Sequence, residues 1–180
     1  MPRGQALDLA CGGGRHSRLL ANLGLDVLAV DRDPQSLLAT AGERISTLAF
    51  DLEQADVESD PAFPLGQGRY TGIVVTNYLH RPLLPLLLSS LAEGGVLVYE
   101  TFALGNGQFG KPANPAFLLA PGELLQAVID HPDRASLRVL AYEDGYTATP
   151  KPAMVQRICV RRDSTAGAEV TAAAMALDGR

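Results

Sequence analysis

The residues best suited to do chemistry lie in the stretch DLACGGGRHS, which runs from Asp8 to Ser17. Asp8 lies inside an apolar run, and three consecutive glycines, Gly12 to Gly14, follow that run. Glycine permits positive φ angles and lets a ligand come close to the backbone. The stretch therefore predicts a nucleotide-type site with a carboxylate close to it.

Two common phosphate-binding loops do not fit this stretch. In the dinucleotide fingerprint G-x-G-x-x-G the third glycine would fall at Ser17, and the stretch lacks the Gly-Lys-Ser/Thr of a P-loop. A carboxylate at Asp8 would repel a pyrophosphate, whereas it would attract a cation such as an ammonium group. We therefore expect a nucleoside ligand that carries an amino acid and no phosphate.

Two further carboxylates end apolar runs, at places where they could bind the ribose and the base of a nucleoside. Asp31 ends the second run, 19 residues after Gly12, where an acid can accept hydrogen bonds from ribose hydroxyls. Asp51 ends the third run and can accept from an adenine amino group, while Leu52 packs on the base. Arg32 either flanks the adenine face or is solvated. Methionine, ribose and adenine would thus be bound in order, which predicts S-adenosylmethionine as cofactor and S-adenosylhomocysteine as product.

The pattern of apolar runs predicts the elements that position these residues. Buried strands alternate with helical spacing, which favours an α/β, Rossmann-like, doubly wound and mostly parallel seven-stranded sheet with helices on both faces. The last two strands lack a helix between them, so the last strand should run antiparallel. Ligands bind at the carboxyl ends of strands in such sheets. We expect strands at 5–10, 25–30, 45–50, 70–76, 96–101, 137–142 and 155–160, and helices at 15–23, from Asp33, at 82–91 and at 121–129.

Five short motifs, in order, resemble those of the class I S-adenosylmethionine-dependent methyltransferases. LDLACGGG resembles their motif I, with Asp8 at the acid position, Ala10 in place of the first glycine, and Gly12 and Gly14 as the others. AVDRDP, AFDLEQ, GIVVTNYLH and LAEGGVLVYET are similar to the ribose motif, the adenine motif, motif IV and the approach to strand five. DLACGGGRHS, FLLAPGEL and YED also resemble the small tellurite-resistance-like, type 11–12 branch.

Together, the residue pattern and this resemblance imply one set of cofactor contacts and a place for the acceptor. The expected cofactor-binding residues are Asp8, Ala10, Cys11, Gly12, Gly14, Arg15, Asp31, Arg32, Asp51, Leu52, Asn77 and Tyr78. The acceptor would lie near Asn77, Tyr78 and His80. His80 precedes a predicted helix, whose dipole favours a neutral imidazole that can act as a base; otherwise it is a cap or a surface residue. Tyr78 is a second candidate, although it fits better as a wall beside the donor.

Two other parts of the chain leave alternatives open. Glu100, at the end of the fifth strand, contacts the acceptor or is a structural partner of Arg81 or a backbone amide. The Gly/Pro/Asn-rich loop 104–114 is a lid over the acceptor, with Phe109 and Phe117 as apolar walls, or an ordinary connection. His16 and His131 are expected to be surface or helix residues.

The composition of the chain weighs against several classes of function. The 180 residues are 47% hydrophobic, which suits one domain over 1–162 and a flexible tail over 163–180. A net charge of −5 without a basic stripe weighs against a nucleic-acid partner, and no apolar run approaches a bilayer span. The two cysteines lack metal-ligand spacing, so we expect no metal and a cytoplasmic location. The leucines of 83–88 fit burial as well as an interface, which leaves monomer and homodimer open.

Three functions remain in order of preference. The first is a methyltransferase that transfers a methyl group to a small or medium acceptor by in-line displacement. The second is an NAD-dependent oxidoreductase with a Rossmann domain, and the third is a non-catalytic module that binds S-adenosylmethionine. The first strand starts almost at once, without the preceding helices usual in the resembled family. We therefore expect a more open cofactor pocket and weak affinity.

Overall fold

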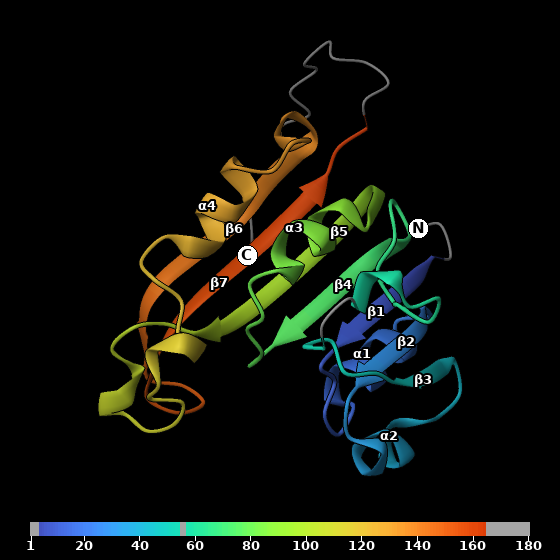
Figure 1. Ribbon diagram of the computed structural model, residues 1–180, viewed down its shortest axis with the longest axis horizontal. Coiled ribbons are helices and arrows are strands. Elements are labelled where there is room, and N and C mark those ends of the chain that lie inside the picture. The colour runs from blue at the N-terminus through green and yellow to red at the C-terminus, as the bar shows by residue number, and fades with distance from the viewer. Residues whose placement is uncertain (1–3, 55–56, 165–180) are drawn as a thin grey trace, which may run out of the picture.

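The computed structural model describes residues 4–54 and 57–164, so the expected tail beyond Ser164 lies outside the described residues. One seven-stranded sheet has the order β3-β2-β1-β4-β5-β7-β6 (Figure 1). The strands are β1 Gln5–Leu9, β2 Asp26–Asp31, β3 Ile45–Ala49, β4 Tyr70–Thr76, β5 Leu91–Phe102, β6 Leu137–Thr147 and β7 Ala153–Arg162. The helices are α1 Arg15–Asn22, α2 Pro34–Thr40, α3 Leu83–Ser89 and α4 Glu123–Ile129.

The topology confirms the predicted fold. β1, β2, β3, β4 and β5 pair in parallel, and β7 pairs antiparallel with both β5 and β6. The strand order reverses at β1, which lies between β2 and β4. The crevice at such a reversal is where open α/β sheets bind ligands.

The element boundaries differ most from the sequence prediction at α3, β5 and the last two strands. The helix expected over 82–91 ends at Ser89, and β5 already begins at Leu91. Gly94 has a φ of 74° and belongs to the irregular start of β5, where the pairing with β4 shifts register. The last two strands are longer than expected because their antiparallel register continues to the pair Thr147 and Ala153.

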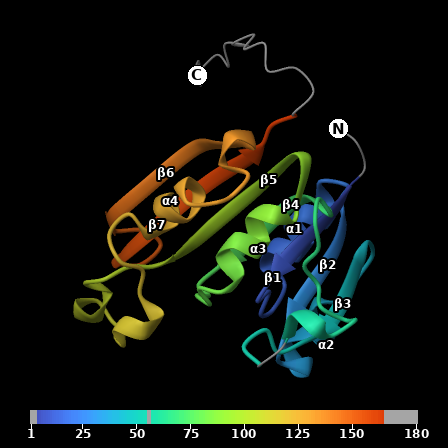
Figure 2. The ribbon, with the colours of Figure 1, turned by 45° about the horizontal axis from the view of Figure 1, so that its top comes forward.

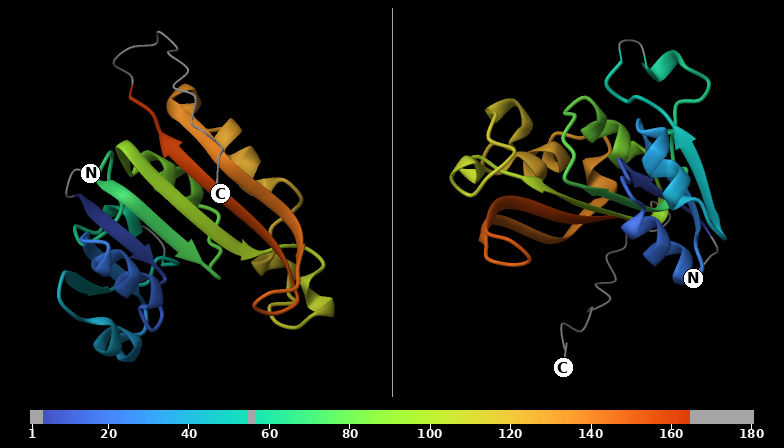
Figure 3. Two further views of the ribbon diagram at one scale, coloured as in Figure 1. Left: turned by 180° about the vertical axis from the view of Figure 1, so that it is seen from behind. Right: turned by 90° about the horizontal axis from the view of Figure 1, so that it is seen from below.

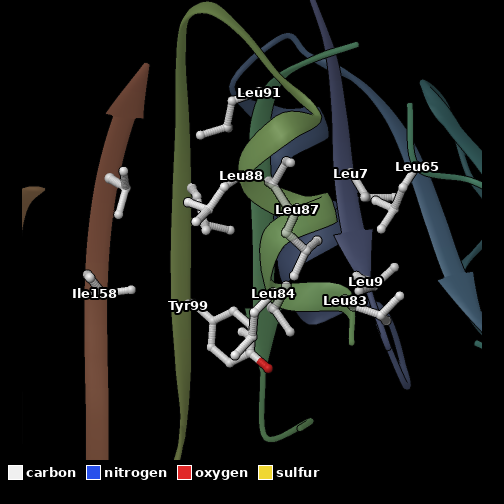
Figure 4. Packing of buried hydrophobic residues seen from close by; sticks show 14 of the residues in the cluster. Leu7, Leu9, Leu65, Leu83, Leu84, Leu87, Leu88, Leu91, Tyr99 and Ile158 are labelled. Atoms are coloured by element: carbon white, nitrogen blue, oxygen red, sulfur yellow. The ribbon is translucent and has the colours of Figure 1, made fainter. Parts of the chain in front are cut away.

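The main core lies between the sheet and the helices α3 and α4, which cover one face side by side (Figure 2). Leu83, Leu84, Leu87 and Leu88 of α3 are all buried there. Figure 4 shows them packed with Leu7 and Leu9 of β1 and with Tyr99 of β5. Burial against the sheet therefore accounts for most of the leucine run at 83–88.

The other face of the sheet is covered only in part. Alternate residues of a strand point to opposite faces. Leu7 therefore faces α3, whereas Asp8 faces α1 and accepts a hydrogen bond from its Ser17. α1 and α2 pack on β1, β2 and β3, and no other described helix lies on this face (Figure 3). Within the described residues, no helix is long and apolar enough to cross a membrane.

Candidate functional site

A cavity of about 260 Å³ opens at the carboxyl ends of β1 to β4. Its lining brings together seven of the predicted cofactor-binding residues from four separate segments: Ala10, Asp31, Arg32, Asp51, Leu52, Asn77 and Tyr78. Phe50 and Glu53 also line it and were not predicted. The signal that could have found them is their position on either side of Asp51-Leu52.

The backbone after β1 turns sharply beneath this cavity. Ala10, Gly12 and Gly14 have φ angles of 55°, 50° and 72°. A Cβ on Gly12 would meet no atom within 4 Å, so its conformation, and not its packing, requires glycine. A Cβ on Gly14 would collide with Thr40 of α2, so glycine there also allows the close contact between the loop and α2. Ala10 holds the same kind of conformation without being glycine.

Asp31 is held in place by the loops on both sides of it. Its Oδ2 accepts a hydrogen bond from the Gly12 N–H at 2.8 Å, and its Oδ1 accepts from the Asp33 N–H at 3.0 Å. Each carboxylate oxygen has a second lone pair for a further donor. Asp31 is thus an oriented acceptor at the cavity, as a ribose diol would require.

Asp8 lies below the cavity and does not line it. The residue is 1% exposed, and the Ser17 hydroxyl donates to Asp8 Oδ2 at 2.6 Å. Burial raises the pKa of Asp8, while Ser17 and the nearby His16 oppose that rise. The contact between Asp8 and a cofactor ammonium group therefore remains a prediction.

Cys11, Gly12, Gly14 and Arg15 also stay outside the cavity lining. The Cys11 N–H donates to the Val30 carbonyl at 3.0 Å, which ties the loop to β2. Burial, with the nearby carboxylates of Asp8 and Asp31, raises the pKa of the Cys11 thiol to about 12. Arg15 is exposed, and its guanidinium lies 3.2 Å from the His16 imidazole. Their contacts with a cofactor remain predictions.

The far end of the cavity has the composition expected of an adenine site. Asp51 Oδ1 accepts from the Glu53 N–H at 3.0 Å, and Leu52 is 5% exposed. Burial and the nearby carboxylates of Glu53 and Asp51 raise the pKa of Tyr78 well above its ordinary value. Its phenol is therefore protonated at neutral pH and lies on this acidic side of the cavity.

The residues predicted for the acceptor are only partly brought together. Asn77 lines the cavity with a φ of 56°, and its N–H donates to the Glu100 carbonyl at 2.9 Å. His80 is half-buried in the turn before α3, where its carbonyl accepts from the Leu83 N–H, and it does not line the cavity. Since α3 begins at Leu83, His80 does not occupy the start of that helix.

The side chain of Glu100 pairs with Arg157 and not with Arg81, the partner considered from the sequence. Arg157 Nε lies 2.5 Å from Glu100 Oε2, and a second arm of Arg157 pairs with Glu143 at 2.9 Å. Arg81 instead pairs with Glu123 at 2.6 Å and donates to two carbonyls of the segment before α4. The pairing of Glu100 with Arg81 is therefore wrong.

The loop after β5 is fixed by its own hydrogen bonds. Asn106 is 2% exposed; its amide donates to the Pro112 carbonyl and accepts from the Met154 N–H. Phe109 packs on Tyr146 of β6 with ring centroids 5.2 Å apart. Neither Phe109 nor Phe117 lines the cavity, which favours an ordinary connection over a lid.

His16 is a helix residue, as the sequence predicts, whereas His131 is buried. His16, in the first turn of α1, is half-buried, and its Nδ1 is 3.4 Å from Thr76 Oγ1 at the end of β4. His131 is 5% exposed, against expectation, and contacts the Ser89 hydroxyl at 3.0 Å. It lies between the ends of α3 and α4, after the last helical residue, and has a structural role.

The fold is Rossmann-like, and the cavity lies at the point where the strand order reverses. Residues 6–94 match the family model described as a methyltransferase domain. The chain is 33% identical over 108 residues to a protein-L-isoaspartate O-methyltransferase from Chlorobaculum tepidum, covering 60% of this chain and 49% of that protein. It is 32% identical over 103 residues to a trans-aconitate 2-methyltransferase from Variovorax paradoxus, covering 53% of this chain and 38% of that protein. The chain thus spans half or less of these relatives.

Solved structures share the whole fold. An S-adenosylmethionine-dependent methyltransferase from Mesorhizobium loti superposes with a TM-score of 0.65 at 18% identity, covering 90% of this chain and 94% of that one. TehB from Haemophilus influenzae gives a TM-score of 0.64 at 21% identity, covering 91% and 59%. The match over residues 6–94 and the shared fold make the chain similar to S-adenosylmethionine-dependent methyltransferases.

Proposed function

We propose that this chain transfers a methyl group from S-adenosylmethionine to a small or medium acceptor. The observation that carries the proposal is the cavity that joins Asp31, Asp51-Leu52 and Asn77-Tyr78 above the glycine loop. Asp31 would accept from the ribose hydroxyls, and Asp51 with Leu52 would bind the adenine. The methionine part would extend over the loop from Ala10 to Gly14, above the buried Asp8.

The residues of the chain act mainly by positioning. Methyl transfer is a displacement at a sulfonium carbon, so the donor is already activated, and the protein has to place the acceptor in line. A general base is required only if the acceptor must lose a proton. His80 is our candidate for that base, and Tyr78 is better suited to hold the donor because its phenol stays protonated.

The oxidoreductase alternative is not favoured. Ser17, which stands where a dinucleotide fingerprint has its third glycine, is fully buried and donates to Asp8. A buried carboxylate beneath the loop would oppose a pyrophosphate above it. The non-catalytic alternative differs from our proposal only in turnover, so an activity measurement must decide between them.

The acceptor is the open part of the proposal. The two curated relatives are named for different acceptors, L-isoaspartate in proteins and trans-aconitate. Their names therefore do not select one acceptor here. Glu100 is already paired with Arg157, and Phe109, Phe117 and His80 do not line the cavity, so the acceptor side of the cavity is best represented by Asn77. His80 follows Asn77 in the same loop and stays a proposal.

The test is release of S-adenosylhomocysteine from S-adenosylmethionine in the presence of a panel of small amines, thiols, hydroxyls and carboxylates. We expect at least one acceptor to be methylated by the wild-type chain, with strong loss in Asp31→Asn. Asp26→Asn is the matched control, because Asp26 begins the same strand and pairs on the surface with Arg44. Cofactor binding without turnover on any acceptor would favour the non-catalytic module.

A further inference from the structure

Tyr99 of β5 lies in the core, yet its hydroxyl reaches the loop that follows β4. Alternate residues of β5 share a face of the sheet, and Leu97, Tyr99 and Thr101 are all buried. Tyr99 is 1% exposed, and its ring packs with the leucines of α3 (Figure 4). The Tyr99 hydroxyl donates a hydrogen bond to the Tyr78 carbonyl, with the two oxygen atoms 2.7 Å apart. The buried ring thus ties the core to a residue that lines the cavity.

The direction of this hydrogen bond is fixed by the two groups that form it. A backbone carbonyl only accepts, so the phenol of Tyr99 must carry its proton. Burial, followed by the nearby Tyr78 phenol and Glu123 carboxylate, raises the pKa of Tyr99 well above its ordinary value. The Tyr99 hydroxyl therefore remains a donor at neutral pH.

The loop after β4 has a conformation that needs such support. Asn77 has a φ of 56°, in the left-handed region, and a residue other than glycine stays there only where its surroundings hold it. β5 holds Asn77 by accepting from its N–H at the Glu100 carbonyl, 2.9 Å away. It holds Tyr78 through the hydroxyl of Tyr99. Consecutive residues of β5 therefore hold consecutive residues of the loop.

Asn77 and Tyr78 are also the residues through which this loop lines the cavity. Tyr99 itself does not line it, so Tyr99 can act on the cavity only through its neighbours. Side-chain rotamers depend on the backbone dihedrals of the same residue. A hydrogen bond that fixes the Tyr78 carbonyl therefore also restricts where the Tyr78 ring points.

We propose that Tyr99 is a positioning residue for the cofactor site, which holds Asn77 and Tyr78 in the cavity wall. It acts through the hydrogen bond between its hydroxyl and the Tyr78 carbonyl. A binding site needs supporting residues that lock its wall, because a wall that shifts loses contacts with the ligand. The proposal rests on the proposed function in taking the cavity as the site of S-adenosylmethionine. The hold of Tyr99 on the loop does not depend on any ligand.

Tyr70 provides a matched control at the other end of β4. Its side chain is buried, as that of Tyr99 is, and its hydroxyl donates to the Pro64 carbonyl at 2.5 Å. Tyr70 begins β4, whereas the cavity opens where β4 ends, and neither Tyr70 nor Pro64 lines the cavity. Tyr70→Phe and Tyr99→Phe thus each remove one buried hydroxyl from a backbone carbonyl. Both variants should unfold at a lower urea concentration than the wild type.

Calorimetric titration with S-adenosylhomocysteine is the first test. Tyr99→Phe should bind it about 3–10-fold more weakly than the wild type, the range expected for the loss of one hydrogen bond. Tyr70→Phe should bind like the wild type in spite of its lower stability. Each change removes a single oxygen atom, so both variants should stay folded, which circular dichroism checks. Equal affinity in Tyr99→Phe and the wild type overturns the proposal, because a merely structural Tyr99 would behave like Tyr70.

Hydrogen exchange tests the same contact in the full chain without any ligand. The Asn77 N–H should exchange at least about threefold faster in Tyr99→Phe than in the wild type, because the loop opens more often once its second bond to β5 is lost. Tyr70→Phe should leave this exchange unchanged. Faster exchange in a chain that does not bind S-adenosylhomocysteine would support the hold of Tyr99 on the loop and count against the proposed function alone. Unchanged exchange at Asn77 in Tyr99→Phe overturns the proposal, whatever the chain binds.

Discussion

The Gly12 N–H donates to Asp31 Oδ2 at 2.8 Å, which links the glycine loop after β1 to the end of β2. The two residues are far apart in sequence, yet the same carboxylate orients the loop and lines the cavity. A hydrogen bond to a charged acceptor is among the stronger ones in proteins. The sites expected for the methionine and the ribose are therefore one structural unit, and a change at Asp31 should disturb both.

Ala10 provides a test of strain in the cofactor loop. In the folded chain, its φ of 55° costs a residue other than glycine about 1–2 kcal/mol of strain. A glycine would relieve this strain, but it would also stabilise the unfolded chain by about 0.4–1 kcal/mol through its greater conformational entropy. We expect Ala10→Gly to raise the free energy of unfolding by up to about 1 kcal/mol, measured by urea denaturation. The control Ala6→Gly, in β1 and fully buried, should lower it by about 1 kcal/mol. Equal losses in both variants would contradict strain at Ala10.

Asp8 provides a test of pH dependence. Because burial raises its pKa, the folded chain binds the Asp8 proton more tightly than the unfolded chain does. The stability that this proton contributes is complete below the ordinary pKa of 3.8 and is lost as the pH rises through the folded-state pKa. Asp8→Asn, which does not titrate, should therefore be more stable than the wild type at pH 7, and the difference should shrink near pH 4.

The same variant separates stability from function. If the Asp8 charge attracts the cofactor ammonium group, Asp8→Asn should bind S-adenosylhomocysteine more weakly although it is more stable. Asp26→Asn, on the exposed start of β2, is the control, and its stability should stay close to that of the wild type at both pH values. An Asp8→Asn chain that is less stable than the wild type at pH 7 would contradict the account.

Cys11 should be chemically inert in the folded chain. A thiol with a pKa of about 12 holds roughly a thousandfold less thiolate at pH 8 than one with the ordinary value of 9.0. In a Cys159→Ser background, alkylation by iodoacetamide at pH 8 should therefore be about a thousandfold slower in native than in denatured protein. Similar rates in the two states would show that Cys11 is not shielded as the structure has it.

The sequence was sufficient where a local pattern carries the information. The number of strands and the positions of Asp31 and Asp51 followed from the apolar runs, and the antiparallel last strand followed from the missing helix before it. Packing over long sequence distances could not be predicted in this way. The sequence around His131 does not show that it contacts Ser89 on α3. The sequence around Arg157 does not show that it forms ion pairs with both Glu100 and Glu143.

The identity of the cofactor is the central claim, and calorimetric titration tests it most directly. We expect S-adenosylhomocysteine to bind the wild-type chain and NAD not to bind. Asp31→Asn should bind S-adenosylhomocysteine about 10–100-fold more weakly, which is the loss expected for hydrogen bonds to a charged group. Asp26→Asn should bind like the wild type. Binding of NAD in place of S-adenosylhomocysteine, or equal affinity in Asp31→Asn and the wild type, would contradict the account.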